Sequence, residues 1–417
     1  MGFALPGPEG MCESRAEFWH IVRNGLCCLS SFHSDAVPLR VAGQVRGFDP
    51  VRSLGITKQQ NERYSRAALL GAHAVLRAIE DAGLTSAELS NPRTVLVFAS
   101  LQFTFAHVHR YFDAYARGGH QELGIDYWVG GTPASITSII CNVLDLSCPT
   151  LLIAGSCNVG ARALQVAHDM FRVGDIDRAI IVGADDCLDP VFLSGTCYTS
   201  KQGYRPSTLS DDPRAVRPHD ALQDGNAPGE GAAAVVLESD DLGEMPQAGV
   251  PRVRLYARSS RSNGRSPMAS GPPENVSQDI VGLLDQANID LGQVGFMNSL
   301  CEGTRYIEDF FIDAMAGARS RLGDDTRLKI TNQEAAFGHI AGPSALIKFV
   351  SNVLMMEHAV VTPVVNCQEP YRKLEDEPIV GAAIPLETRY SIVVSAGAGG
   401  DATGVLIERI PPMGCAS

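Results

Sequence analysis

Short apolar runs alternate with amphipathic stretches along the chain, and this alternation predicts the first elements. Two of the runs are rich in β-branched residues, which is typical of buried strands, whereas the longer stretches have apolar residues at helical spacing. Glycines follow two of the amphipathic stretches, as they do at helix ends. The pattern predicts strands over residues 94–100 and 150–154 and helices over residues 58–83, 133–144 and 161–173.

A glycine-flanked turn joins the second strand to the last of these helices. It reads Gly155-Ser156-Cys157-Asn158-Val159-Gly160, and a strand, tight turn and helix in this order form a nucleophile elbow. The turn would lift the side chain of Cys157 away from the backbone, and the helix N-terminus would favour its thiolate. Because free cysteines are often small buried residues, the local sequence leaves both interpretations of Cys157 open.

The composition and net charge of the chain argue against several classes of protein. The 417 residues are 45% hydrophobic and 19% charged, with a net charge of −13, which argues against a general nucleic-acid or membrane-surface binder. No apolar run has the length of a membrane helix, and the N-terminus does not resemble a secretory signal. The 11 cysteines show no metal-ligand spacing, and no carboxylate or cysteine stands at ligand spacing beside His107 and His109. We therefore expect a cytoplasmic protein with reduced thiols and no metal.

Several motifs in order along the chain resemble the β-ketoacyl synthase (ketosynthase) family of thiolase-fold condensing enzymes. In that family a nucleophilic Cys opens a helix that ends in Gly-Asp and leads into a glycine-containing strand, as Cys157, Gly174-Asp175 and the strand after them do here. The family patterns Arg-Pro-Phe-Asp, Asp-Gly-Phe and Gly-Glu-Gly-Ala correspond to 217–220, 224–226 and 229–232.

The resemblance implies an α/β fold, the thiolase-like duplicated fold with α-β-α-β-α layers, and a dimer. A strand, glycine turn and strand do recur, in residues 179–184 with 233–238 and in residues 391–400 with 403–408. Residues 240–250 are polar and form the expected linker. We therefore expect an N-terminal half, 1–245, with the Cys elbow and a C-terminal half, 251–417, with a His motif and a glycine-rich loop.

The catalytic residues that the resemblance implies are only partly present. Ketosynthases use one Cys and two His, and the motif of the second His matches at Phe337-Gly338-His339. The motif of the first His aligns through Asn298 and Gly303-Thr304, which places Leu300 where that His should be.

Further departures surround these positions. Of the two Thr that hold the pantetheine arm in the family, the first is Glu302 and the second is kept as Thr304. The family Lys five residues before the second His is Glu334, and the Phe that gates the pocket is Ala398. The backbone N–H groups of Cys157 and Ala398 can still form an oxyanion hole, because main-chain donors tolerate side-chain changes.

The residues that are kept support one of the family's two reactions, acyl transfer, and the residues that are replaced affect the other, decarboxylation. Acyl transfer onto Cys157 needs a thiolate, an oxyanion hole and a base such as His339, all of which are kept. Loss of CO₂ from a malonyl extender needs polar groups that Leu300 and Glu334 do not replace, which costs ~10²–10⁴ in rate. The sequence thus predicts an acyltransferase of polyketide or fatty-acid type that does not extend chains. Glu302 and Glu334 would suit an amine acceptor if ionised, act as acids if protonated, or pair with an arginine such as Arg305.

Two alternatives stay open: a non-catalytic partner that resembles a chain-length factor, and a competent condensing enzyme in which Glu302 or water replaces the lost His. The donor is expected to be an acyl group on the phosphopantetheine of an acyl carrier protein or of CoA, with no bound cofactor. The family presents a basic carrier-docking patch where Lys58, Arg63 and Arg66 lie. A homodimer is expected, and a heterodimer with a ketosynthase is the alternative.

Overall fold

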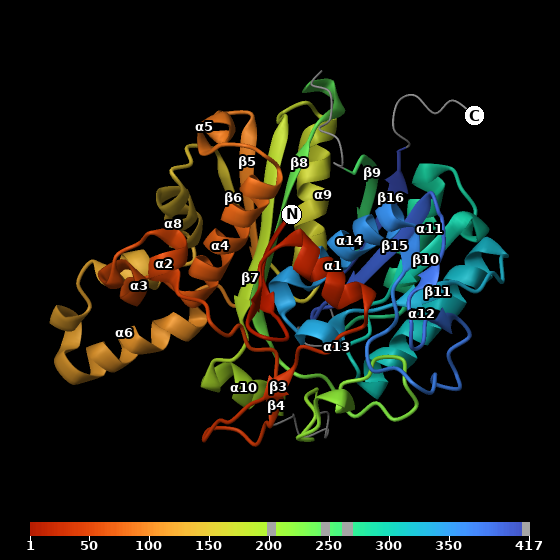
Figure 1. The fold of residues 1–417 in the computed structure, drawn as a ribbon, viewed down its shortest axis with the longest axis horizontal. Helices are drawn as coiled ribbons and strands as arrows, with labels where there is room; N and C mark the ends of the chain where they lie inside the picture. Colours follow the sequence, from red (N-terminus) through yellow and green to blue (C-terminus); the bar gives the residue numbers. More distant parts are fainter. Residues whose placement is uncertain (198–205, 243–250, 261–269, 411–417) are drawn as a thin grey trace.

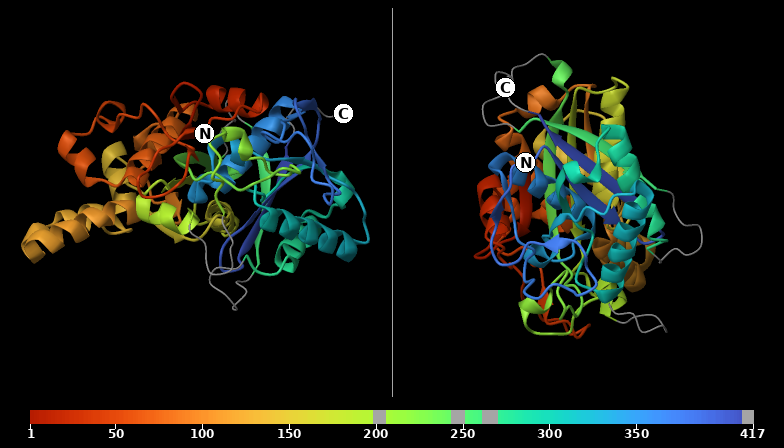
Figure 2. Two further views of the ribbon diagram at one scale, coloured as in Figure 1. Left: turned by 90° about the horizontal axis from the view of Figure 1, so that it is seen from below. Right: turned by 90° about the vertical axis from the view of Figure 1, so that its right-hand side faces the viewer.

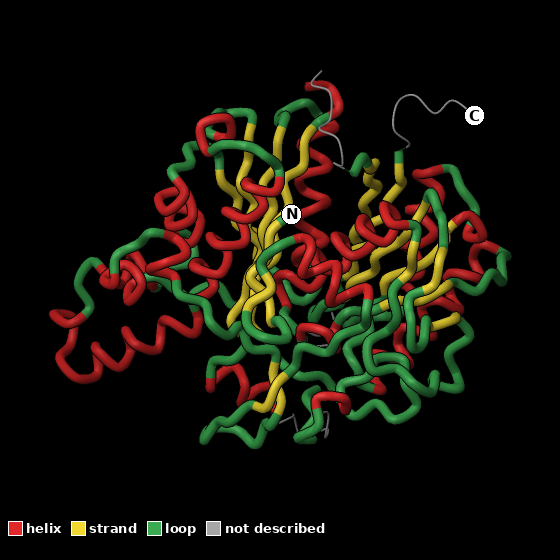
Figure 3. Tube along the Cα trace, in the orientation of Figure 1, coloured by secondary structure: helices red, strands yellow, loops and turns green. Residues whose placement is uncertain are grey.

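Two mixed β-sheets lie side by side at the centre of the computed structural model, which describes residues 1–197, 206–242, 251–260 and 270–410 (Figures 1 and 3). The first sheet has the order β2-β1-β8-β7-β5-β6, with bounds Met11–Cys12, Gly2–Pro6, Glu230–Glu238, Arg178–Asp186, Thr94–Ser100 and Thr150–Ala154. The second has the order β13-β11-β10-β15-β16-β9, with bounds Glu377–Pro378, Lys329–Thr331, Val294–Asn298, Tyr390–Ala396, Ala402–Arg409 and Val253–Ser259.

The strand directions of the two sheets follow one pattern. In the first sheet β6, β5 and β7 are parallel, and β7, β8 and β1 are successively antiparallel. In the second, β11, β10 and β15 are parallel, and β15, β16 and β9 are successively antiparallel. The same order of directions in both sheets is what a duplicated α/β unit produces.

Helices complete the layers between and outside the sheets (Figures 1 and 2). The central layer is α9 with α14, which pack on each other and on strands of both sheets. The outer face of the first sheet is covered by α4, with α8 packed beside it, and that of the second by α11, with α12 beside it. The bounds are Val159–Arg172 for α9, Ala341–His358 for α14, Arg66–Asp81 for α4, Ser135–Leu144 for α8, Glu274–Ala287 for α11 and Arg305–Leu322 for α12.

Shorter elements surround these layers. They are α1 (Arg15–Arg23), β3 (Ser30–Ser31), β4 (Val41–Ala42), α2 (Pro50–Leu54), α3 (Lys58–Arg63), α5 (Ser86–Leu89), α6 (Phe105–Gly118), α7 (Asp126–Gly130), α10 (Pro190–Cys197), α13 (Glu334–Phe337), β12 (Val360–Val361) and β14 (Ile384–Pro385). Within the described part of the chain, no helix combines the length and apolar character needed to cross a membrane.

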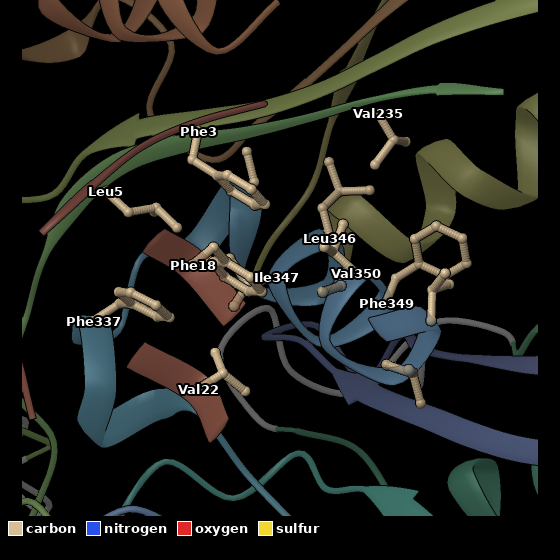
Figure 4. Close-up of a cluster of buried hydrophobic side chains, with 14 of the residues drawn as sticks. Phe3, Leu5, Phe18, Val22, Val235, Phe337, Leu346, Ile347, Phe349 and Val350 are labelled. Atoms are coloured by element: carbon tan, nitrogen blue, oxygen red, sulfur yellow. The ribbon is translucent and has the colours of Figure 1, made fainter. Parts of the chain in front are cut away.

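A stack of three phenylalanines ties the N-terminus to α13 (Figure 4). The ring centroids of Phe3 and Phe18 are 4.3 Å apart, and those of Phe18 and Phe337 are 5.5 Å apart. All three side chains are buried in the same apolar cluster as Leu346 and Phe349 of α14. Burial of aromatic rings supplies a large apolar area, so this cluster fixes the segment between α13 and α14.

The long helix predicted over residues 58–83 is wrong, because the structure divides it into α3 and α4. Tyr64 and Ser65 adopt extended backbone conformations, and the Ser65 side chain accepts a hydrogen bond from the N–H of Ala68. Serine is a strong N-cap because its hydroxyl satisfies a free N–H of the first helical turn. A new helix therefore starts after Ser65.

The other predicted elements are present, with one difference in burial. Residues 94–100 form β5, which is buried at every position, whereas β6 is an edge strand whose Leu151 is 37% exposed. The expectation that residues 150–154 are buried is therefore wrong, because an apolar run does not show whether its strand has one neighbour or two. Of the predicted linker, residues 243–250 lie outside the described residues.

Candidate active site

The predicted elbow is formed by the turn between β6 and α9. Cys157 lies in this turn two residues before Val159, the first residue of α9, and it is partly exposed. A Cβ atom at Gly160 would lie 2.8 Å from the carbonyl oxygen of Gly342. Glycine at this position therefore lets α9 and α14 approach closely, which brings Cys157 to the start of α14.

A chain of three side chains meets at this point. Cys157 Sγ lies 3.0 Å from His339 Nε2, and His339 Nδ1 lies 3.1 Å from Glu334 Oε2. His339 follows α13 and precedes α14, and Glu334 is the first residue of α13. The two halves of the chain thus supply a Cys–His–Glu arrangement with the geometry of a catalytic triad, in which an acidic residue orients the imidazole and the imidazole faces the nucleophile.

Glu334 is held as a carboxylate by several partners. Its Oε1 accepts hydrogen bonds from Ser344 Oγ at 2.6 Å and lies 3.0 Å from Lys348 Nζ, which belongs to α14. Burial by itself would raise the pKa of Glu334, but Lys348 and then His339 outweigh it and lower this pKa below its usual value. The alternative that Glu334 pairs with an arginine such as Arg305 is wrong, because its cationic partner on α14 is Lys348.

The imidazole of His339 is shifted in the opposite direction. Burial alone would lower its pKa, but the negative charges of Cys157 and Glu334 raise it well above the usual value. The contacts with the Cys157 sulfur and the Glu334 carboxylate thus favour the protonated form of the imidazole. With Nδ1–H donated to Glu334, the other nitrogen is directed at the sulfur and can exchange a proton with it.

The remaining predicted site residues lie around this triad. Glu302 Oε2 lies 3.9 Å from His339 Nδ1 and accepts a hydrogen bond of 2.6 Å from Asn226 Nδ2. Thr304 donates its hydroxyl to Glu302 Oε1 at 2.9 Å and also caps α12. Arg305 instead donates to the Ala221 carbonyl and lies over the ring of Tyr371.

Leu300 lies where the resemblance expects a histidine, and the structure puts it among apolar side chains. It belongs to the buried apolar cluster of the C-terminal half, which also includes Cys301 and Phe311. Its side chain has no polar atom, so it can donate no hydrogen bond at this position.

The Ala398 N–H lies beside the elbow, as the predicted oxyanion hole requires. It donates a hydrogen bond of 3.1 Å to Ser156 Oγ, which in turn lies 3.7 Å from Cys157 Sγ. Ala398 itself is exposed, so its N–H is close to a surface that a substrate can approach.

The expected basic patch is largely neutralised. Arg63 forms an ion pair with Asp126 at 3.0 Å, and Arg66 is paired with Glu230. Of the three predicted cations, Lys58 alone has no ion pair among the described residues. Two of the three cations expected to bind an acidic carrier protein are therefore already paired with carboxylates of this chain.

Sequence reasoning missed a second buried network beside Leu300. His219 Nδ1 lies 2.7 Å from Glu308 Oε1, and its Nε2 lies 2.6 Å from Ser299 Oγ. Asn332 donates to Ser299 Oγ and accepts the N–H of Glu334, which links this network to the triad. With Cys301, His219 and Glu308 could hold a metal ion, but both nitrogens of His219 already have hydrogen-bond partners.

The sequence contained a sign of some of the residues that sequence reasoning missed. His219 and Asn226 stand where the family patterns have Phe, so each was a visible departure. Lys348 gave a weaker signal, as a single cation inside the apolar run of α14. Buried lysines are almost always paired, but the sequence does not say that the partner is Glu334.

Comparisons with known proteins agree with this architecture. The chain matches the family "Beta-ketoacyl synthase, N-terminal domain" over residues 1–242 and "Beta-ketoacyl synthase, C-terminal domain" over residues 255–368. It is 25% identical to the tetracenomycin polyketide synthase ketoacyl synthase alpha subunit of Streptomyces glaucescens, covering 96% of this chain and 93% of that protein. It is 22% identical to 3-oxoacyl-[acyl-carrier-protein] synthase 2 of Vibrio harveyi, covering 93% and 92%.

Among solved structures, the ishigamide ketosynthase/chain length factor superposes with a TM-score of 0.81 at 18% identity and covers 98% of both chains. The predicted thiolase-like fold is thereby confirmed.

Proposed function

The chain belongs to the β-ketoacyl synthase family, and from this premise we propose that it is an acyltransferase that does not extend chains. It takes an acyl group from a carrier-protein or CoA thioester onto Cys157 and passes it to an acceptor other than malonyl. The observation that carries the proposal is the triad of Cys157, His339 and an ionised Glu334.

His339 takes up a proton and gives it back in each half of the reaction. In the first half, Cys157 Sγ attacks the thioester carbonyl carbon, and the leaving thiol takes the proton that His339 Nε2 has received from Cys157. In the second half, His339 Nε2 takes the proton of a hydroxyl, amine, thiol or water as that group attacks acyl-Cys157, and returns it to Sγ. Glu334 holds Nδ1–H throughout and stabilises the imidazolium.

The residues that depart from the family pattern have partners of their own, which favours a site with an altered function over a site that has lost its function. Glu334 has Lys348 as its partner, Glu302 has Asn226, and His219 has Glu308. Each of these groups is buried, and a buried charge or polar group without a partner is costly. The matched partners at three separate positions keep the site stable, and the retained contact of Cys157 with His339 favours an enzyme.

The proposal excludes decarboxylation because of Leu300 and Glu334. Leu300 offers no hydrogen bond to the enolate that forms when CO₂ leaves. Glu334 stands where the family has a cation, and its own charge is compensated by Lys348 and His339, so it offers the malonyl carboxylate no positive partner. Once Cys157 is acylated and the leaving thiol has taken the proton, His339 Nε2 can act as the base toward an acceptor.

Intact-protein mass with labelled malonyl-carrier protein tests the proposal. The wild type should gain one acyl mass from an acyl thioester, release little ¹⁴CO₂ and lose the acyl mass when a suitable acceptor is added. Cys157→Ala should gain no mass. Robust CO₂ release with a β-ketoacyl product would restore ordinary chain extension, and a label on Cys301 would refute the elbow assignment.

A second candidate function is a non-catalytic partner of an active ketosynthase, favoured by the superposition on a ketosynthase/chain length factor and by Leu300. In that case neither acylation nor CO₂ release should be seen with the protein alone. Co-expression with a ketosynthase should then yield a one-to-one complex. The intact triad makes this the weaker candidate.

We propose that the acyl donor arrives on the phosphopantetheine of an acyl carrier protein, which a relative, the Vibrio harveyi enzyme, has in its name. Thr304 and Glu302 stand where the family holds the pantetheine arm. The two halves, 1–245 and 251–417, contribute Cys157 and His339 respectively, so the site exists only when both are docked.

A further inference from the structure

The main-chain donor expected to bind the oxyanion already has a hydrogen-bond acceptor. The N–H of Ala398 donates to Ser156 Oγ at 3.1 Å. Ser156 directly precedes Cys157, and its Oγ lies 3.7 Å from Cys157 Sγ. The Ser156 hydroxyl thus stands between the nucleophile and the donor that would stabilise its tetrahedral intermediate.

The loop that carries this donor is fixed at several points. A Cβ atom at Gly397 would lie 2.8 Å from Ser156 Cβ and 2.7 Å from Asn158 Oδ1, so the loop rests directly on the elbow. At its other end Asp401 forms an ion pair of 2.8 Å with Arg162 on α9. The direction of the Ala398 N–H is therefore set by packing.

The Ser156 side chain has more freedom than this loop. Serine is not β-branched, and rotation about its single χ1 bond moves Oγ without displacing the backbone. Ser156 is partly exposed, and Ala398 is exposed. Rotation of one hydroxyl is thus enough to free the N–H for another acceptor.

We propose that Ser156 gates acylation by occupying the oxyanion donor until a substrate carbonyl replaces it. The inference rests on the proposed acylation of Cys157. The incoming carbonyl oxygen takes over the hydrogen bond of the Ala398 N–H, and Ser156 Oγ turns away to solvent or to the sulfur. No covalent bond of Ser156 is made or broken.

This role separates two reactions of the same thiol. Acylation passes through an oxyanion and needs the Ala398 N–H. Alkylation by iodoacetamide is a direct displacement at carbon, forms no oxyanion and reports only the nucleophilicity of Cys157. The ratio of the two rates therefore isolates the gate from any effect of Ser156 on the thiolate.

The experiment compares Ser156→Ala with the wild type by intact-protein mass, using an acyl-CoA thioester at saturation and iodoacetamide in parallel. Loss of one hydrogen bond that must be broken should raise the ratio of acylation to alkylation about 2- to 10-fold. Ser395→Ala is the control, because Ser395 is a buried serine of β15 whose hydroxyl has no hydrogen-bond partner among the described residues. Its ratio should stay at the wild-type value.

Each outcome decides the proposal. A lower ratio in Ser156→Ala would show that the hydroxyl helps to bind the oxyanion, and an unchanged ratio would show that it does not compete; both overturn the gate. Ser156→Thr is a second variant: its hydroxyl is retained on a stiffer side chain, so its ratio should fall below the wild type. If the wild type is alkylated but not acylated, acylation appearing in Ser156→Ala supports the gate, whereas none in either variant refutes both the gate and the proposed function.

Discussion

At the scale of single residues, the candidate site depends on compensation between buried groups. Without Lys348 the buried carboxylate of Glu334 would lose its permanently charged partner, and without Glu334 the buried ammonium of Lys348 would lose the carboxylate it pairs with. The pair also orients the reaction, because an ionised Glu334 fixes the tautomer of His339. Glu334 departs from the family pattern, yet in this structure it is the residue that orients the imidazole of the triad.

A mutant cycle on this pair should show the coupling. Lys348→Met removes the permanently charged partner of the buried Glu334 carboxylate and should lower the free energy of unfolding by about 3–5 kcal/mol. The double variant Glu334→Gln with Lys348→Met removes both charges and should recover a large part of that loss. Urea denaturation at neutral pH measures both; a loss below about 1 kcal/mol in Lys348→Met would contradict a buried, mutually stabilised pair.

At the scale of elements, α14 positions the site because its N-terminus is pressed against the first sheet. A Cβ atom at Gly183 of β7 would lie 2.6 Å from the carbonyl oxygen of Gly342 and 2.8 Å from Pro343 Cα. Asp185, also on β7, accepts the N–H of Gly342 at 2.6 Å. The contact leaves no space, so the start of α14 and the neighbouring His339 are placed by this strand.

Gly183→Ala should therefore disturb both stability and the site. Its methyl group meets backbone atoms that cannot move separately, so we expect a loss of about 1–3 kcal/mol and slower alkylation of Cys157 as His339 shifts away. Gly195→Ala on α10 is the matched control: a Cβ atom there meets nothing within 4 Å, and alanine favours a helix. Thermal unfolding and iodoacetamide rates check both variants, and equal behaviour of the two would refute the close contact.

Many of the elements and part of the candidate site could be predicted from the sequence, and the predictions that failed did so for physical reasons. Strand β5 and the elbow were found because burial and glycine placement are local signals. The break at Ser65 was missed because apolar periodicity continues across it, and only the cap ends one helix and starts the next. The exposed face of β6 and the pairing of Glu334 with Lys348 depend on which segments meet in space, and no local pattern encodes that.

At the scale of the whole molecule, one side of the N-terminal half is left with an open sheet edge and an apolar arm. Among the described strands, β6 pairs only with β5, and the segment with α6 and α7 projects from the body (Figure 2, left). Large side chains are exposed on this arm, among them Phe112 at 67%, Ile125 at 69% and Trp128 at 65%. Open edges and exposed apolar patches are usually covered by a partner, which supports the dimer expected from the sequence.

The last prediction concerns this surface. The wild type should be a dimer by light scattering at micromolar concentration, because a two-fold axis beside β6 would pair the two edges and bury the arms. Leu151→Lys combined with Trp128→Glu places charges on both parts of the surface and should give monomers without unfolding the protein. Val380→Lys, at an apolar position in the other half that is 41% exposed, is the control and should stay dimeric. A wild type that is monomeric alone but forms a one-to-one complex with a ketosynthase would replace the homodimer by the heterodimer and shift the balance toward the partner function, because the same surface would then be reserved for a different chain.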